Sequence, residues 1–318
     1  MSQGHMRRQH WASLGETTFV GGTWLLYGVY RLFGRWPFRL CLYPVVLAYW
    51  LASGVARRAS LQYLRRLHEA EGVFAQRPGA AQSLRHFACF AETLLDKMLA
   101  IGGRYPRANV HFSGHEAMLA TAKAGRGGVI VTAHMGCLEL MQMAATWREG
   151  LRVTILVHTA HAQRFNRILE RLNPQASVRL MQVTDFSPTT AMMLADRVET
   201  GEFIAIAGDR VPVSGDRIAR AGFLGHPAEL PAGPYLIAAV LRCPVFLLSC
   251  LHAGEGYRVR IQRLAERIVL DRANRQAGLD AQAGQFAHWM AASLRESPYD
   301  WFNFYPFWDT ALHARSAH

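Results

Sequence analysis

The sequence predicts an α/β protein with a largely parallel sheet covered by helices. Three observations lead to this expectation. After Val110, short apolar runs alternate with helical segments; before it, apolar residues recur at helical spacing; and no linker rich in Gly, Ser or Pro divides the second part of the chain. Alternating strand and helix patterns are typical of crossover connections between parallel strands. A chain of 318 residues is long enough for a complete core.

The amino-terminal part has the character of a membrane-associated segment. Leu40 to Ala56 carries no charge, and arginines stand on both sides of it. Its roughly 17 residues are near the minimum for crossing a bilayer, so spanning the membrane and lying on its surface both remain open. A helix buried in the core is a third possibility. Many aromatic residues in this region favour the headgroup layer of a bilayer: Trp24, Tyr27, Tyr30, Trp36, Tyr43, Tyr49 and Trp50.

The remaining elements follow from periodicity. From Arg57 to about Gly102, apolar residues recur every three or four positions, which predicts helices, and Pro78-Gly79 separates them. Short β-branched and aromatic runs then predict four buried strands. These strands are expected at residues 128–132, 153–157, 203–207 and 245–248.

The charge balance narrows the choice of partners. Lys and Arg number 35 against 23 Asp and Glu, giving a formal net charge of +12, and such a charge attracts polyanions. The basic residues are dispersed and no zinc finger or RNA-binding signature accompanies them, so nucleic acid ranks below an anionic lipid surface or an acidic carrier protein. The five cysteines form no C-x-x-C pair, which fits a reducing compartment, and the amino terminus shows no secretory signal pattern.

One histidine and one carboxylate stand where α/β proteins usually keep their sites. His134 follows the predicted strand 128–132, Gly136 permits a tight turn, and Glu139 falls in the first turn of the next predicted helix. A carboxylate that accepts the N–H of an imidazole fixes the tautomer, leaving the other nitrogen to take a proton from a nucleophile. By spacing alone, a hydrogen-bonded loop histidine beside a solvated carboxylate explains the pair better than a catalytic role does.

The wider context resembles a known family. Gly125 to Leu140 (GRGGVIVTAHMGCLEL) resembles the His-x4-acid block of the lysophospholipid acyltransferase superfamily, in the Glu form of the lipid A late acyltransferases. Gly208-Asp209-Arg210 and the stretch 223–245 look like the third and fourth blocks of that branch. The tail at 298–308 (PYDWFNFYPFW) resembles a subgroup associated with aryl polyene or polyketide lipid pathways. Four blocks in order are more specific than any one of them.

This resemblance implies an acyltransferase with a mixed or mostly parallel sheet wrapped by helices. The donor would be an acyl carrier protein or coenzyme A thioester, and the acceptor a hydroxyl or amine of a lipid-like molecule at the cytoplasmic face of the inner membrane. His134 would act as general base, held by Glu139, without a covalent enzyme intermediate and without a cofactor. Residues 1–60 would form the membrane-associated segment and residues 61–318 the catalytic domain.

The resemblance also implies a set of substrate-binding residues. Asp209 and Arg210 would orient an acceptor or donor phosphate, although a strand-end salt bridge explains them too. In the loosely matching second block, Arg164 and Asn166 would hold the thioester oxygen or the donor arm. The site wall would be formed by residues that ordinary turn chemistry explains as well: Phe223, Gly225, Pro231, Gly233 and Pro234.

Other chemistries fit less well. His158 and His161 lack a third ligand at a recognisable spacing, so no metal is expected. The chain has no G-x-S-x-G elbow, Walker loop or G-x-G-x-x-G turn. Gly-Asp-Arg replaces the Glu-Gly-Thr block of phospholipid-making relatives, which disfavours a glycerol phosphate acceptor. Two alternatives remain: a thioesterase or lipid hydrolase using the same dyad on water, and a non-catalytic lipid- or carrier-binding scaffold.

Overall fold

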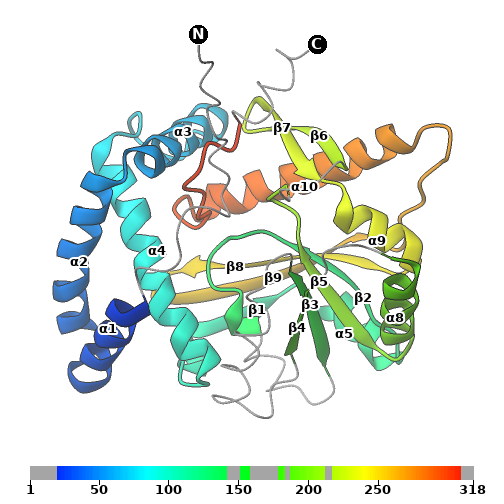
Figure 1. Cartoon of the computed structure of the whole chain (residues 1–318), viewed down its shortest axis with the longest axis horizontal. Helices are drawn as coiled ribbons and strands as arrows, with labels where there is room; N and C mark the ends of the chain where they lie inside the picture. The colour runs from blue at the N-terminus through cyan, green and yellow to red at the C-terminus, as the bar shows by residue number, and fades with distance from the viewer. Residues whose placement is uncertain (1–19, 142–150, 158–177, 183–186, 212–216, 309–318) are drawn as a thin grey trace, which may run out of the picture.

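A computed structural model of the chain describes residues 20–141, 151–157, 178–182, 187–211 and 217–308. Its centre is a seven-stranded sheet with the order β1-β9-β8-β2-β5-β3-β4 (Figure 1). The strands of this sheet are β1 (Val110–Ser113), β2 (Gly128–Thr132), β3 (Arg152–Val157), β4 (Val178–Gln182), β5 (Glu202–Ala207), β8 (Val245–Ala253) and β9 (Gly256–Ala265). A separate hairpin pairs β6 (Ile218–Phe223) with β7 (His226–Pro231).

The sheet is mixed and mostly parallel, as predicted. Every neighbouring pair of strands runs parallel except β8 and β9, which form an antiparallel hairpin. The four strands expected from the sequence correspond to β2, β3, β5 and β8. Strand β2 is buried along its whole length, and its alternate residues enter different cores. Val129 and Val131 belong to one hydrophobic cluster and Ile130 to the other, as the two-residue period of a strand requires.

Helices cover the sheet and extend to one side of it. They are α1 (Val20–Phe33), α2 (Arg35–Ala52), α3 (Gly54–Glu71), α4 (Ala80–Ile101), α5 (Glu116–Lys123), α8 (Pro188–Glu199), α9 (Gly233–Leu241) and α10 (Arg275–Glu296). The predicted break at Pro78-Gly79 separates α3 from α4. The long helix α10 packs on β6, while α2 packs on α4 away from the sheet (Figure 1).

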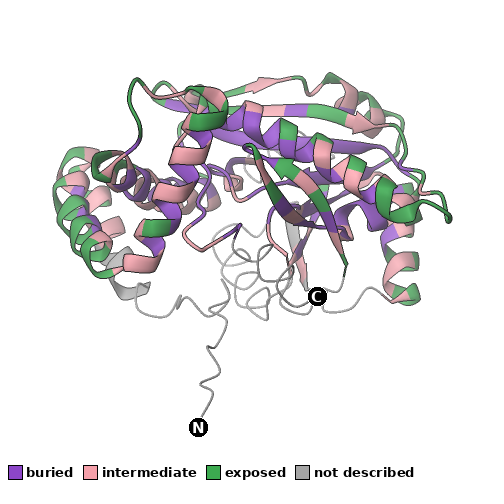
Figure 2. Cartoon of the chain, turned by 90° about the horizontal axis from the view of Figure 1, so that it is seen from above, coloured by how far each residue is buried: buried purple, intermediate pink, exposed green. Residues whose placement is uncertain are grey.

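The predicted membrane segment is split between α2 and α3. Phe38, Leu42 and Val46 form the buried side of α2. Only this face of α2 therefore fits the alternative of a helix buried in the core. The opposite face leaves large apolar side chains exposed, visible as the green outer helices of Figure 2. None of the described helices is individually long and apolar enough to cross a membrane. Helices α2 and α3 meet the length and composition criteria together, but they are bent by 96°. Membrane association and the boundary near residue 60 stay predictions.

The last described residues return to the sheet. The segment 297–308 leaves α10 and runs back beside the end of β2, where Met135 and Trp301 form an antiparallel bridge. Trp301, Phe307 and Trp308 are buried in a cluster of aromatic rings. The Trp/Phe-rich tail is therefore part of the core, and it lies against the residues that follow β2.

Candidate active site

His134 and Asp209 are brought together by two neighbouring parallel strands. Thr132 of β2 pairs with Ala207 of β5, and Gly208 N–H donates to the carbonyl of Thr132 at 2.8 Å. Two residues further along each strand, His134 and Asp209 lie side by side. His134 Nδ1 is 2.8 Å from Asp209 Oδ1, and the His134 backbone N–H donates to Oδ2 at 3.1 Å.

This geometry fixes which imidazole nitrogen is available. A carboxylate accepts hydrogen bonds, so Nδ1 carries the proton that Asp209 receives, and Nε2 keeps its lone pair. Among the described residues, no hydrogen bond engages Nε2. The His134 side chain is 41% exposed, whereas that of Asp209 is fully buried. The arrangement suits a general base held from behind by a buried carboxylate.

The surrounding groups tune both pKa values. Burial alone would raise the pKa of Asp209, but His134, Arg210 and the Trp301 indole hold it well below its usual range. Burial lowers the pKa of His134, and the nearby cation of Arg210 lowers it further, against the opposing effect of Asp209. Asp209 is thus ionised and His134 neutral at pH 7, which is the state that a base requires.

A glycine shapes the loop after His134. Gly136 has φ +56°, and a Cβ there would lie 1.9 Å from the carbonyl oxygen of Cys250. Its N–H donates to Asp300 O at 2.9 Å, and the next N–H, of Cys137, donates to Cys250 O at 3.0 Å. The predicted tight turn at Gly136 is confirmed, and the turn lies flat against the end of β8.

Glu139 does not hold the His134 imidazole in this structure. The turn at Gly136 directs the following residues towards α4, where Lys97 Nζ lies 3.0 Å from Glu139 Oε1. Burial alone would lower the pKa of Lys97, but the Glu139 carboxylate keeps it raised. The predicted hydrogen bond from His134 to Glu139 is thus replaced by one to Asp209. A catalytic role for Glu139 stays a prediction.

Arg210 lies next to the pair. Its Nη2 donates to the carbonyl of Phe302 at 3.2 Å, and its guanidinium lies 5.8 Å from the ring centre of Tyr305. The cation is close enough to both His134 and Asp209 to lower their pKa values. A phosphate or a developing oxyanion beside His134 would meet this positive charge.

The residues predicted to form the wall of the site lie further from His134 and Asp209 in the network of contacts. Phe223 packs edge-on against Trp301, with ring centres 5.3 Å apart. Leu224 and Gly225, with φ values of 51° and 75°, form the two-residue turn between β6 and β7. Pro231 ends β7, and Gly233-Pro234 begins α9. In the described part of the chain, no hydrogen bond or ion pair joins these turn and helix-start residues to His134 or Asp209, so their role in binding stays a prediction.

Several sequence candidates cannot be compared with the structure. Arg164 and Asn166 fall outside the described residues, as do His158 and His161. Two residues that sequence reasoning missed lie next to the pair instead. Trp301 donates its indole N–H to Asp209 Oδ2 at 3.0 Å, and Phe302 N–H donates to His134 O at 3.2 Å. The aromatic tail was noticed as a family feature, but nothing in its sequence indicates a contact with Asp209.

A second histidine cluster could in principle ligate a metal ion. Ligand atoms of Cys89, His252 and Asp300 lie within 4.8 Å of one another. These atoms already bond to each other, with His252 Nδ1 2.5 Å from Asp300 Oδ1 and Cys89 Sγ 3.5 Å from the same oxygen. His252 Nε2 is 2.8 Å from the hydroxyl of Tyr257. Hydrogen bonding therefore accounts for the cluster.

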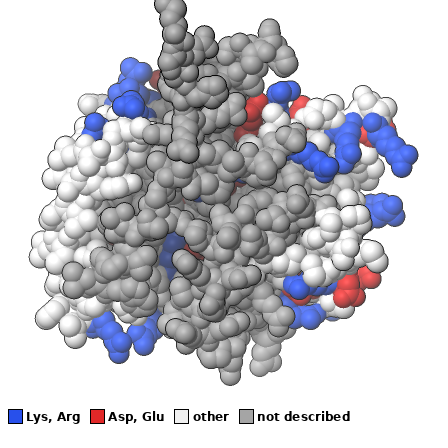
Figure 3. Space-filling view, viewed as in Figure 1, with Lys and Arg blue, Asp and Glu red and all other residues white. Residues whose placement is uncertain are grey.

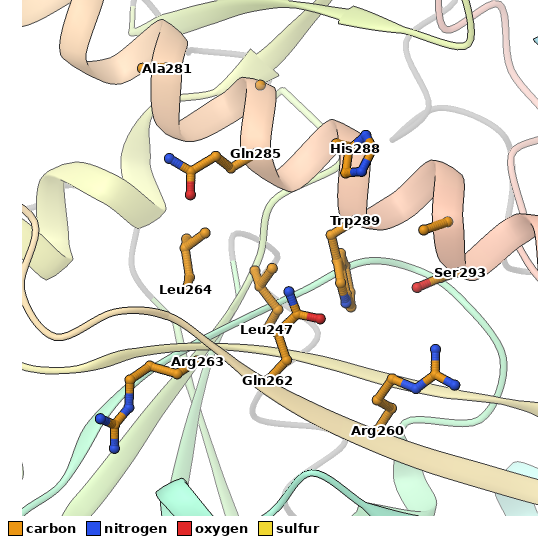
Figure 4. A pocket seen from close by; sticks show the side chains of 12 residues that line it. Leu247, Arg260, Gln262, Arg263, Leu264, Ala281, Gln285, His288, Trp289 and Ser293 are labelled. Atoms are coloured by element: carbon orange, nitrogen blue, oxygen red, sulfur yellow. The ribbon is translucent and has the colours of Figure 1, made fainter.

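A cavity of about 640 Å³ lies between α10 and the β8–β9 hairpin. Figure 4 shows polar side chains around it, including Arg260, Gln262 and His288. Neither His134 nor Asp209 lines this cavity. It is therefore separate from the His134–Asp209 pair.

Comparison with known proteins gives one distant relative to report. No protein-family model matches the chain. The chain is 23% identical over 186 residues to phosphatidylinositol mannoside acyltransferase of Mycolicibacterium smegmatis. The match covers 58% of this chain and 58% of that protein. The relative is named as an acyltransferase, and the similarity does not fix a family or a subgroup for this chain.

Proposed function

We propose that this protein is an acyltransferase that moves an acyl group from a thioester to a hydroxyl or amine of a lipid. The observation that carries the proposal is the His134–Asp209 pair, with Nδ1 held by a buried carboxylate and the side chain partly exposed. The distant likeness to an enzyme named as a lipid acyltransferase supports it, as does the order of the four sequence blocks.

The reaction follows from the geometry of the pair. The acceptor donates its proton to His134 Nε2 while its oxygen or nitrogen attacks the thioester carbonyl. The tetrahedral intermediate collapses, the C–S bond breaks, and the imidazolium returns the proton to the leaving thiolate. Asp209 stabilises the imidazolium by charge. No bond to the enzyme forms at any step.

Two cations lie near the imidazole and have roles in this scheme. Arg210 follows Asp209 directly and donates to the carbonyl of Phe302, and Lys97 forms the ion pair with Glu139. The charges of both lower the pKa of His134. Either one stabilises negative charge on the carbonyl oxygen or on a substrate phosphate. In this proposal Asp209 takes the orienting role predicted for Glu139, and Glu139 fixes Lys97 by their ion pair.

We assign the reaction to a membrane surface, the cytoplasmic face of the inner membrane. The outward face of α2 carries Trp36, Leu40 and Leu51, each more than 60% exposed. On the side of the molecule where α1 and α2 lie, Figure 3 shows mostly uncharged surface, with basic groups above and below it. An apolar face beside basic groups suits a helix lying in the headgroup layer of an anionic membrane.

The proposed donor is an acyl carrier protein. Carrier proteins are acidic, and a net charge of +12 favours their encounter with this chain. The acceptor would be a lipid of the kind made in aryl polyene or related polyketide lipid pathways. Coenzyme A also carries phosphates, so salt dependence alone does not separate the two donors. The deciding comparison is catalytic efficiency on one acyl group presented by each carrier at equal ionic strength.

A transfer assay tests the proposed function. Radiolabelled palmitoyl thioester is incubated with the protein and a bacterial lipid extract, and labelled lipid is separated from free acid. Transfer predicts a labelled lipid whose formation requires the extract. A thioesterase would release free palmitate at the same rate with or without the extract, and a binding scaffold would leave the thioester intact.

His134→Ala tests the base within that assay. Without Nε2, the acceptor must attack unassisted, and positioned general-base catalysis typically contributes about 10²- to 10⁴-fold. We expect a fall in transfer rate of that size with an unchanged circular dichroism spectrum. A variant that keeps more than half of the wild-type rate would remove His134 from the mechanism.

A further inference from the structure

Two histidines in this protein are held by carboxylates in the same way. His134 gives both its backbone N–H and Nδ1 to Asp209. His252, near the end of the adjacent strand β8, gives both groups to Asp300, at 2.6 and 2.5 Å. The second pair is closed, because Tyr257 occupies its Nε2. In the first pair, Nε2 of His134 is available to accept a proton. The second pair, His252–Asp300, holds its segment in place, and we call it the Asp300–His252 anchor.

The two pairs are joined through consecutive residues. Asp300, the anchor carboxylate, is followed by Trp301, whose indole N–H donates to Asp209 Oδ2 at 3.0 Å. That oxygen also accepts the backbone N–H of His134. The hydroxyl of Ser297 donates to Asp300 at 2.7 Å, so the position of Asp300 is fixed independently of Trp301.

The backbone on both sides of Trp301 binds the loop that carries His134. Gly136 N–H donates to Asp300 O at 2.9 Å, and Phe302 N–H donates to His134 O at 3.2 Å. The indole itself is 1% exposed. It packs edge-on against Tyr63, with ring centres 5.0 Å apart. These contacts leave the indole little freedom to turn away from Asp209.

We propose that Trp301 is a positioning residue for the His134–Asp209 pair, and that the Asp300–His252 anchor holds it in place. The inference rests on the proposed function and extends it to a residue that does not touch substrate. A carboxylate with one oxygen toward His134 Nδ1 must be prevented from rotating. Trp301 fixes the second oxygen, so that the imidazole presents Nε2 in one orientation.

The segment offers a matched control for the indole. Trp308 is also buried, at 2% exposure, and stacks on Phe223 in the same aromatic cluster. Among the described residues its indole nitrogen has no hydrogen-bond partner. Trp301→Phe and Trp308→Phe thus remove similar ring volume from one cluster. Only the former removes a donor to Asp209.

Steady-state transfer kinetics give the first readout. For Trp301→Phe we expect kcat to fall about 10- to 100-fold, the usual effect of a misplaced catalytic group, with KM for both substrates within twofold. Trp308→Phe should keep kcat within threefold at an equal folded fraction. Equal losses in the two variants would show that Trp301 only fills space and would overturn the proposal.

NMR titration of the histidine side chains gives a readout independent of transfer. The indole dipole points its positive end at the pair, so its removal should favour the imidazolium and raise the pKa of His134. The other charges acting on His134, from Asp209, Arg210 and Lys97, stay in place. An unchanged His134 titration in Trp301→Phe would contradict the proposal. The titration does not depend on transfer activity. If the wild type transferred no acyl group, the proposed function would be refuted, but the titration would still test the role of Trp301.

A second variant covers the case in which Trp301→Phe does not fold. Benzothienylalanine at position 301 keeps the bicyclic ring and replaces the N–H by sulfur. It should reproduce the loss of kcat and the shift of the His134 titration at wild-type thermal stability. A benzothienylalanine protein with wild-type kcat and wild-type His134 titration would overturn the proposal.

Discussion

At the scale of single residues, the backbone turn at Gly136 keeps His134 beside Asp209. The positive φ turns the chain immediately after the strand-end loop, and the absence of a Cβ lets it lie against the carbonyl of Cys250. His134 therefore stays beside Asp209, while the residues after Cys137 are directed towards α4. A side chain at this glycine would push the loop away from β8 and from Asp300.

Gly136→Ala should therefore destabilise the fold strongly. A new Cβ would lie 1.9 Å from Cys250 O in a left-handed conformation, so we expect a loss of about 3 kcal/mol or more in the free energy of unfolding. Gly225→Ala is the control, since Gly225 has φ +75° and open space around its Cβ position. Its cost should be about 1 to 2 kcal/mol. Urea unfolding of both variants checks this, and equal losses would contradict the close approach at Gly136.

The sequence predicted the base but not its partner. His134 is predicted from its place just after a strand, whereas Asp209 is implied by the resemblance to the Gly-Asp-Arg block. Glu139 is predicted as the partner because it is close along the chain and because the resemblance to the His-x4-acid block implies it. The actual pairing depends on β2 and β5 being adjacent in register, which is a long-range property. His134 and Asp209 each follow the end of a strand by two residues. This equal offset predicts their pairing only when the two strands are known to be neighbours in the sheet.

At the scale of elements, the segment 297–308 connects the helical layer to the loop that carries His134. His86 of α4 is fully buried. Its Nε2 is 2.8 Å from Trp301 O, and its Nδ1 is 3.0 Å from Ser60 Oγ of α3. Since a carbonyl accepts hydrogen bonds, Nε2 carries a proton. Burial lowers the pKa of the ring, so the ring is neutral at pH 7. His86 thereby holds Trp301 from its backbone side.

This buried histidine predicts a pH dependence of stability. Burial lowers the pKa of His86 to about 4, whereas an unfolded chain has a histidine pKa of about 6.5. Between these values the unfolded state binds a proton that the folded state does not, so stability is complete above about pH 6.5 and falls as the pH drops towards 4. At pH 4.5 this effect lowers the free energy of unfolding by about 2 to 3 kcal/mol relative to neutral pH.

Comparison of His86→Gln with wild type isolates this contribution. The amide can still donate to Trp301 O and accept from Ser60, but it does not titrate. Urea unfolding at pH 7 and pH 4.5 should show a smaller acid loss in the variant, by about 2 kcal/mol or more. An identical acid loss in both proteins would contradict the assignment of His86 as a neutral buried group.

Periodicity predicted some elements better than others. The strands at β2, β3, β5 and β8 were found because each is a short run of apolar residues. Strand β9 has arginines at Arg258, Arg260 and Arg263 that reduce its apolar character, and β1 has four residues. Strand β1 lies at the edge of the sheet, and β9 lies between β1 and β8. Polar residues within a strand and a short strand length both weaken the apolar signal on which the prediction depends.

At the scale of the whole molecule, the α/β unit that holds the His134–Asp209 pair lies beside helices with an exposed apolar face. The ion pair of Arg35 with Asp96 and that of Arg39 with Glu92 fasten α2 to α4. On the outward face of α2, Trp36, Leu40 and Leu51 remain exposed. In the proposed arrangement, a membrane surface covers these side chains and supplies the lipid acceptor to the His134–Asp209 pair.

Substitution of the outer face of α2 tests this arrangement. Leu40, Leu47 and Leu51 are 68%, 43% and 61% exposed, so a triple Leu→Gln variant should keep its fold. Burying a leucine is worth about 1.5 to 3 kcal/mol, and we expect partition to phosphatidylglycerol vesicles to fall at least about tenfold. A matched set elsewhere, Met192→Gln with Val240→Gln and Val269→Gln, should partition as wild type. Wild-type partition of the α2 variant would rule out this face as the membrane contact.

In the proposed mechanism Asp209, rather than Glu139, holds the His134 imidazole. The most direct test is the transfer rate of Asp209→Asn against Glu139→Gln, measured with one thioester donor at equal folded fraction. Asn at 209 cannot stabilise the imidazolium by charge and can impose the wrong tautomer, so kcat should fall about 10³- to 10⁴-fold. Glu139→Gln keeps the polar contact with Lys97 and should lose less than about tenfold. A large loss in Glu139→Gln with a nearly unaffected Asp209→Asn would contradict the account.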